Sequence, residues 1–298
     1  MRLKIAVSVV RSRPWAPFIP HLLLISFLAG FGTTALRASD AVVRGLDHVP
    51  IAVGDLEKAR TGYEALGFVI KPGRPHPNGI ENVHVKFPDG TEVELITATR
   101  GTDALSSDYL NWLKDGDGPA FLGLFAPNLD SLAMSLWPHG LSLRNRDGVF
   151  LIKEQPGLRV FFSRRQHAPT DRPEHFAHPN TAFSLSGVWL AGGEAESGIV
   201  RMLGGAPSTT EACSHLGPAI EVQAVPEAKF YLLPASAQLV PGRTIVGLTI
   251  SVRVLEAARR ILDKSQIRYF SSENCREPGL WIAPVAAHGV WLELRQQS

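Results

Sequence analysis

The sequence predicts an α+β fold made of two domains, each built from a pair of βαβββ units. Residues 45–97 of the 298-residue chain read as a strand, a helix and three further strands, and residues 245–296 repeat this order. In both stretches a glycine precedes a glutamate of the closing strand by four positions, Gly90 before Glu94 and Gly289 before Glu293. Two fainter copies lie between them, so the sequence indicates a fourfold internal repeat.

The first strand and helix of the first unit have clear boundaries. Residues 46–53, LDHVPIAV, place Val49 and Ile51 on one face and His48 on the other, as the two-residue period of a strand requires. Asp55 is suited to cap the following helix, and Gly67 is suited to end it. The apolar stripe of this helix consists of Leu56, Ala59, Tyr63 and Leu66.

The closing strand of the first unit, TEVELITA, follows the same logic. Val93 and Leu95 are expected to face the helix, so Glu92 and Glu94 face away from it. We expect Glu92 to be a solvated charge at the rim of the sheet. His48 and Glu94 are expected to lie on neighbouring strands with their functional groups within roughly 3 to 5 Å, the separation that a shared ion or a hydrogen bond needs.

The other three units are recognised by the same order of elements. The second runs from AFLGLFAP through a helix at residues 129–136 to LRVFFSRR, the third from LSGVWLAG to KFYLLPAS, and the fourth from TIVGLTIS to HGVWLELRQ. Paired units predict a first domain at residues 45–170 and a second, degenerate domain at residues 181–298. The connecting segment, residues 165–180, is rich in proline, histidine and charge, which is typical of a linker.

The amino-terminal 38 residues have the composition of an export signal. They contain five basic residues and no acidic residue, and residues 18–31 form a nearly continuous apolar run. Cleavage after Ala35 or Ala38 would release a periplasmic or secreted protein; the alternative is an uncleaved membrane anchor. The rest of the chain has 25 basic and 28 acidic residues, which gives no electrostatic reason to expect a nucleic-acid partner. No stable membrane partner is expected after cleavage.

The chain contains two cysteines, Cys213 and Cys275. In an oxidising compartment they are able to form a disulfide bond within the second half; the alternative is two separate thiols in apolar surroundings. Their spacing excludes a CxxC metal or redox motif.

The motifs of the first unit carry a family resemblance. GLDHVPIAVGDLEKARTGYEALGF, HPNGIENVHVKF and DGTEVELIT together resemble the vicinal-oxygen-chelate superfamily, and in particular its glyoxalase-like branch. The resemblance implies a curved sheet whose concave face, called the cup here, receives one metal ligand from the first strand and one from the closing strand of each unit. His48 and Glu94 match the histidine and glutamate ligands of a divalent ion such as Zn, Mn, Fe, Ni or Co. Glu94 would alternatively act as a general base.

The resemblance is incomplete at the remaining ligand positions. The matching first-strand residues are Phe121, Ser186 and Gly247, and the matching closing-strand residues are Phe161, Tyr231 and Glu293. Phe121 and Phe161 are expected to form an apolar substrate-binding floor, and His84 is expected to point into the cup. In the second domain only Glu293 remains, and Arg295 on the same face is expected to pair with it, so we expect no metal there.

Two functions follow from the resemblance. The first is an exported, metal-dependent lyase or isomerase that polarises a small oxygenated substrate through a Lewis-acid metal. The second is a metal-free protein that binds and sequesters a small molecule in the same cup. The fold alone does not select between them.

Overall fold

A computed structural model describes residues 41–146, 148–155, 158–165, 167–204, 208–272 and 275–297. The expected export signal at residues 1–38 lies outside these ranges. The described residues all belong to one compact unit. Within the described ranges, no helix is long and apolar enough to cross a membrane.

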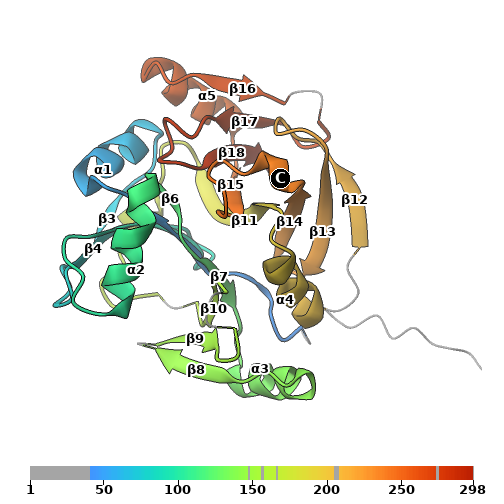
Figure 1. Cartoon of the computed structure of the whole chain (residues 1–298). Coiled ribbons are helices and arrows are strands. Elements are labelled where there is room, and N and C mark those ends of the chain that lie inside the picture. Colours follow the sequence, from blue (N-terminus) through green and yellow to red (C-terminus); the bar gives the residue numbers. More distant parts are fainter. Residues whose placement is uncertain are drawn as a thin grey trace, which may run out of the picture. The chain divides into compact units, whose positions relative to one another are not determined.

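The first half of the chain contains two units joined by a helix (Figure 1). The first unit comprises β1 (Gly45–Leu46), β2 (His48–Ala52), α1 (Leu56–Ala65), β3 (Lys71–Pro72), β4 (Ile80–Lys86) and β5 (Glu92–Ala98). The connection contains α2 (Ala104–Trp112) and the short 3-10 helix η2 (Leu113–Asp115). The second unit comprises β6 (Gly118–Pro119), β7 (Leu122–Phe125), α3 (Leu129–Leu136), η3 (Trp137–His139), β8 (Leu143–Arg146), β9 (Val149–Ile152) and β10 (Val160–Ser163).

The second half repeats this arrangement after η4 (Pro173–Phe176). Its first unit comprises β11 (Ala182–Ala191), α4 (Glu194–Gly204), β12 (Ser208–Ala212), β13 (Ala219–Val225) and β14 (Ala228–Leu233), followed by η5 (Ala235–Ala237). Its second unit comprises β15 (Ile245–Val252), α5 (Leu255–Lys264), β16 (Tyr269–Ser271), β17 (Gly279–Ile282) and β18 (Trp291–Gln296).

The strand order shows that the two halves share one topology. The second half forms one eight-stranded sheet in the order β12-β13-β14-β11-β15-β18-β17-β16. The first half forms two sheets, β3-β4-β5-β2-β6 and β1-β7-β10-β9-β8. Only short gaps in the chain separate β1 from β2 and β6 from β7, so the two sheets follow one another directly. Their combined strand order matches that of the eight-stranded sheet. The α+β fold of paired βαβββ units is therefore as predicted.

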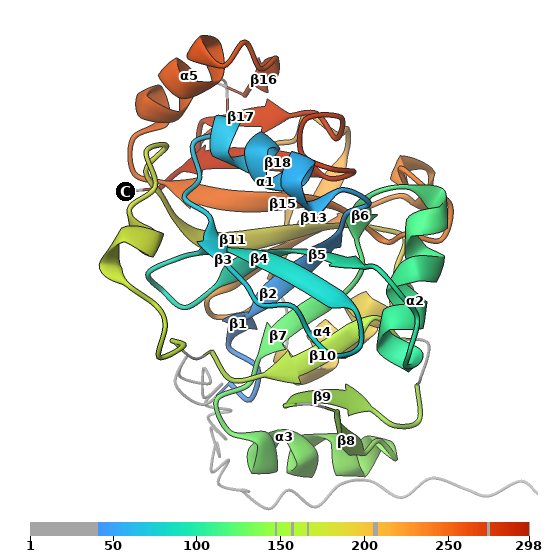
Figure 2. The same ribbon diagram turned by 90° about the vertical axis from the view of Figure 1, so that its left-hand side faces the viewer.

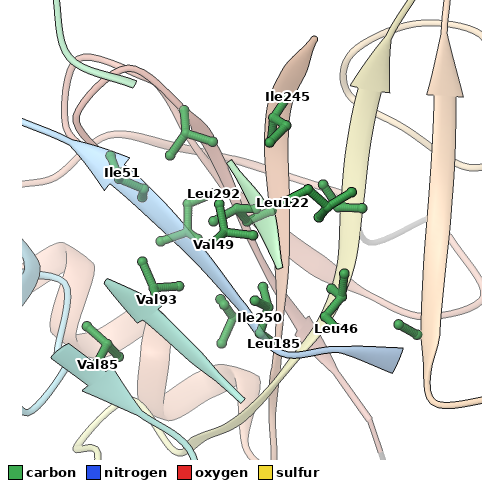
Figure 3. Close-up of a cluster of buried hydrophobic side chains, with 14 of the residues drawn as sticks. Leu46, Val49, Ile51, Val85, Val93, Leu122, Leu185, Ile245, Ile250 and Leu292 are labelled. Atoms are coloured by element: carbon green, nitrogen blue, oxygen red, sulfur yellow. The ribbon is translucent and has the colours of Figure 1, made fainter. Parts of the chain in front are cut away.

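The helices and the core form as the sequence pattern requires. The Asp55 carboxylate caps α1 by accepting the Lys58 N–H at 2.9 Å, and Gly67 takes a positive φ of 86° after the helix. Val49 and Val93 lie in the core on the face that α1 covers. One buried apolar cluster runs through both halves of the chain (Figure 3). The expected domain bounds at 45–170 and 181–298 therefore stay a prediction.

The segment expected to be a linker is packed against the first half. The Lys71 ammonium donates to the Asp171 carboxylate. His178 is buried; its Nδ1 accepts the Val69 N–H at 3.0 Å and its Nε2 lies 2.8 Å from the Lys86 carbonyl oxygen. Burial lowers the pKa of His178, although its hydrogen bond to Lys86 opposes this change. The connection is thus part of the folded structure.

The two cysteines form a disulfide bond. The Cα atoms of Cys213 and Cys275 are 5.8 Å apart, within the usual range for a disulfide. Cys213 follows β12 and Cys275 precedes β17, so the bond connects the two ends of the eight-stranded sheet. The first of the two alternatives is therefore confirmed.

Candidate small-molecule site in the first half

A pocket of about 550 Å³ opens on the cup side of the first half. Figure 2 shows α2 beside the strands that form this cup. The apolar side chains of α2 join a small cluster with the cup face of β2 and β5, separate from the main core. The pocket is lined by His48, Pro50, Arg74, His76, Pro77, Asn78, Ile80, Asn82, Glu94, Ile96, Asp103, Leu105, Tyr109, Phe121, Arg146, Val149, Leu151 and Phe161.

His48 and Glu94 meet at one end of this pocket. They lie on β2 and β5, which are parallel neighbours in the sheet. The Nε2 atom of His48 is 3.8 Å from Oε2 of Glu94. Val49 and Val93 face the core, so alternation turns both polar side chains toward the cup, as predicted. The proximity follows from strand geometry, while their roles as metal ligand or base stay predictions.

His48 is held by a chain of polar groups. Its Nδ1 lies 2.6 Å from Oδ2 of Asp47, and the same oxygen accepts the Ser163 hydroxyl at 2.6 Å. Burial disfavours the charged imidazole, but the hydrogen bond to Asp47 and the negative charges of Asp47, Glu92 and Glu94 outweigh it. The pKa of His48 therefore rises to about 9. At neutral pH the side chain is an imidazolium whose Nε2–H faces the pocket.

Glu94 is fixed by a second contact within the cup. Its Oε1 accepts the Asn82 side-chain N–H at 2.6 Å, which leaves Oε2 on the side of His48. Tyr109 of α2 lines the same pocket, and burial raises the pKa of its phenol well above the usual value. The polar end of the pocket thus combines an imidazolium, a carboxylate, an amide and a protonated phenol.

Two phenylalanines form a wall of the pocket, while their role in binding a substrate stays a prediction. The ring centroids of Phe121 and Phe161 are 6.5 Å apart, and Phe161 lies 4.8 Å from the His48 ring. Phe121 also contacts Tyr109 edge to face at 5.8 Å. The resemblance expects oxygen or nitrogen donors at the positions of both phenylalanines.

The donor set does not complete a metal site. His48 and Glu94 are placed as two ligands of one ion would be, with Asp47 orienting the imidazole from behind. Protein metal sites of this kind use at least three protein ligands. Across the described residues, no group of three or more His, Cys, Asp and Glu side chains is placed to hold an ion.

His84 lies outside the larger pocket. It lines a separate hollow of about 280 Å³, together with Asp47, His48, Lys86 and Glu92. Its Nδ1 is 3.1 Å from Oε1 of Glu92. The expectation that Glu92 is a solvated rim charge is wrong, because its side chain is only 14% exposed and also pairs with Lys86. The substrate-binding role of His84 stays a prediction.

Comparison with known proteins agrees with this architecture. Residues 46–198 match the model of the glyoxalase-like domain. The chain belongs to the glyoxalase-like domain family. The resemblance to the vicinal-oxygen-chelate superfamily is thereby confirmed. None of the curated proteins matched the sequence.

Solved structures of similar fold cover most of the chain. A 2,2',3-trihydroxybiphenyl 1,2-dioxygenase from Sphingomonas wittichii has a TM-score of 0.57 at 14% identity, over 86% of this chain and 91% of that one. A mutant 4-hydroxymandelate synthase from Streptomyces coelicolor has a TM-score of 0.57 at 11% identity, over 86% and 93%. The Mn(II)-bound glyoxalase from Novosphingobium aromaticivorans has a TM-score of 0.54 at 12% identity, over 86% and 83%. At these identities the likeness shows the fold.

The second half of this glyoxalase-like protein has its equivalent cup filled by side chains. Trp189 stacks on Tyr231 at 3.9 Å between ring centroids, and a Cβ at Gly247 would lie 3.1 Å from Trp189. Buried Glu293 pairs with Arg295 at 2.7 Å, as expected, and accepts the Thr249 hydroxyl at 2.7 Å. The indole of Trp189 thus takes the volume that a ligand would need.

Several pocket residues were missed by sequence reasoning. Asn82 shares a strand face with His84, so alternation was sufficient to place it on the cup face. Its position next to Glu94 also depends on the strand register, which pairs Asn82 with Ile96. Tyr109 belongs to a helix that lies between two units and therefore has no counterpart in the repeat. Arg74 and Arg146 come from a loop and from the end of a strand, where no periodic signal exists.

Proposed function

We propose that the chain binds a small organic molecule in the cup of its first half without a resident metal ion. The main support is that Phe121 and Phe161 line the pocket at the two positions where the resemblance expects further metal ligands. A volume of about 550 Å³ is typical of a ligand pocket. Apolar walls with a few polar groups at one end suit a partly apolar, oxygenated molecule.

The relatives support a small-molecule ligand. The similar structures include dioxygenases and a glyoxalase, and one of them is described as Mn(II)-bound. This chain keeps their fold, but among the described residues no third His, Cys, Asp or Glu side chain is placed with His48 and Glu94 to hold an ion. The metal-dependent lyase or isomerase expected from the resemblance therefore has less support than a metal-free binding protein.

A second candidate is an enzyme that moves a proton, and the contact between His48 and Glu94 favours it. In such a reaction Glu94 takes the proton from a carbon beside a carbonyl group, and the C–H electron pair moves toward the carbonyl oxygen. The Nε2–H of His48 stabilises the resulting enolate oxygen. Return of the proton to the neighbouring carbon gives an isomer, and loss of a leaving group from that carbon gives a lyase product.

The two candidates separate at Glu94. Glu94→Gln keeps the shape and the hydrogen bond from Asn82 but removes the basic oxygen. For a binding protein, affinity for the ligand is expected to change by less than about tenfold, the value of one hydrogen bond. If the protein is an enzyme, the wild type is expected to exchange a carbon-bound proton of the ligand with solvent, and Glu94→Gln is expected to lose this exchange. NMR spectroscopy in deuterated water measures the exchange. Absence of ligand binding by the wild type would refute both candidates.

We further propose that the protein is exported. The basic start and apolar run of residues 1–38 support this, as does the Cys213–Cys275 bond, because disulfides persist in oxidising compartments. Fractionation and amino-terminal sequencing are expected to find a periplasmic or secreted chain that starts at Leu36 or Ser39. A full-length chain in the cytosol would contradict the proposal.

A further inference from the structure

Two guanidinium groups line the pocket where it meets solvent, called its mouth here, and have no hydrogen-bond or ion-pair partner among the described residues. Arg74 lies in the loop between β3 and β4, Arg146 ends β8, and both line the pocket. Neither guanidinium forms a hydrogen bond or an ion pair with any residue that the structure describes. Two guanidinium cations that line one pocket repel each other, and an anion bound between them removes this repulsion.

A carboxylate at the mouth of the pocket, that of Asp103, already caps helix α2. Asp103 lines the pocket, but its carboxylate caps α2 by accepting the Ser106 N–H and hydroxyl, both at 2.7 Å. It also accepts the Asn78 side-chain N–H at 2.9 Å. These contacts lower the pKa of Asp103 to about 2, and the positive charge of Arg146 contributes to the lowering, so Asp103 stays charged. The mouth therefore keeps an excess of positive charge.

The side chains around His48 have a different character. His48 lies beside the carboxylates of Asp47 and Glu94, so this part of the pocket does not favour an added anion. The apolar lining comprises Ile80, Ile96, Leu105, Phe121, Leu151 and Phe161, and Phe161 lies 4.8 Å from the His48 ring. The pocket thus combines polar side chains around His48 and Glu94, apolar walls and two guanidinium groups.

We propose that the ligand of the cup is an amphipathic organic anion. Its carboxylate binds Arg74 and Arg146, its apolar body lies between Ile96 and the two phenylalanines, and a neutral oxygen at its far end meets His48. Paired guanidinium groups suit this task because their planar donors match the oxygens of a carboxylate. The inference rests on the proposed small-molecule function and adds the chemical class of the ligand.

The test compares phenylalkanoates of increasing chain length with the matching uncharged phenylalkanamides, by isothermal titration calorimetry on the full chain. We expect at least one carboxylate to bind about tenfold more tightly than its amide, the effect of one charge-assisted hydrogen bond. Raising the ionic strength from about 0.05 to about 0.5 M is expected to weaken the carboxylate and leave the amide unchanged.

Three variants localise the effect. Arg74→Met and Arg146→Met keep the aliphatic stem and remove the charge, and each is expected to reduce the preference for the carboxylate severalfold. Arg144→Met removes the same charge two residues from Arg146, at an exposed position that does not line the pocket, and is expected to leave the preference unchanged. An equal loss in all three variants would reveal a general electrostatic effect and overturn the proposal.

The outcomes separate this inference from the function on which it rests. If acid and amide bind equally, and Phe161→Ala weakens both, the cup binds small molecules but the anion class is wrong. If neither binds at any soluble concentration, the proposed function and the anion class both fail. A carboxylate preference that disappears in the double variant Arg74→Met/Arg146→Met would confirm the ligand class.

Discussion

Removal of the Cys213–Cys275 bond is expected to destabilise the protein by about 4 kcal/mol. The two cysteines are 62 residues apart in the chain, and the loop-closure entropy of a cross-link of that length gives about this value at 25 °C. Cys213 is exposed and Cys275 half-buried. Replacing both with alanine therefore removes little packing, so the change acts mainly through the unfolded chain.

The assay is urea unfolding of the wild type and of Cys213→Ala/Cys275→Ala, each with and without reductant. Reductant is expected to bring the wild type close to the variant and to leave the variant unchanged. Ligand binding in the first half is expected to survive in both, because neither cysteine lines that pocket. A loss below about 1 kcal/mol would refute the reasoning, since it would mean that the bond constrains the unfolded chain far less than its loop length requires.

Two further predictions concern the connection between the halves and the cup. The pKa of His178 is lowered from its usual 6.5 in the folded chain. Between the two pKa values the unfolded chain therefore binds a proton at this residue that the folded chain does not bind. The stability that His178 contributes is complete above pH 6.5 and is lost as the pH falls toward the lowered pKa. Unfolding followed from about pH 7 to about pH 5 is expected to show a steeper loss for the wild type than for His178→Gln, and equal slopes would contradict the assignment. The double variant Phe121→His/Phe161→Glu is expected to supply the missing donors and bind Zn²⁺ at least about tenfold more tightly than the wild type. Equal zinc affinity by calorimetry would show that the phenylalanines do not occupy ligand positions.

The elements that the sequence predicted well are those with a strong local period. Alternation in β2 and β5 placed His48 and Glu94 together because a strand turns successive side chains to opposite faces. The step from Gly90 to Glu94, repeated from Gly289 to Glu293, indicated the repeat because equivalent turns and strands keep their spacing.

Features made by contacts between distant residues were not predictable in this way. The solvated position expected for Glu92 was wrong because Lys86 and His84 of the neighbouring strand converge on it. Residues 165–180 looked like a linker by composition, yet Asp171 and His178 fasten them to the first half. The cationic mouth depends on a loop and a strand end, where sequence carries no periodic signal.

The central claim is that the cup binds its ligand without a resident metal. The most direct test is elemental analysis of the protein purified without refolding from its native compartment, combined with ligand titration in the presence and absence of a chelator. The account predicts far less than one equivalent of Zn, Mn, Fe, Ni or Co per chain and the same ligand affinity with chelator. One equivalent of metal that is lost in His48→Ala, with ligand binding abolished by the chelator, would contradict it.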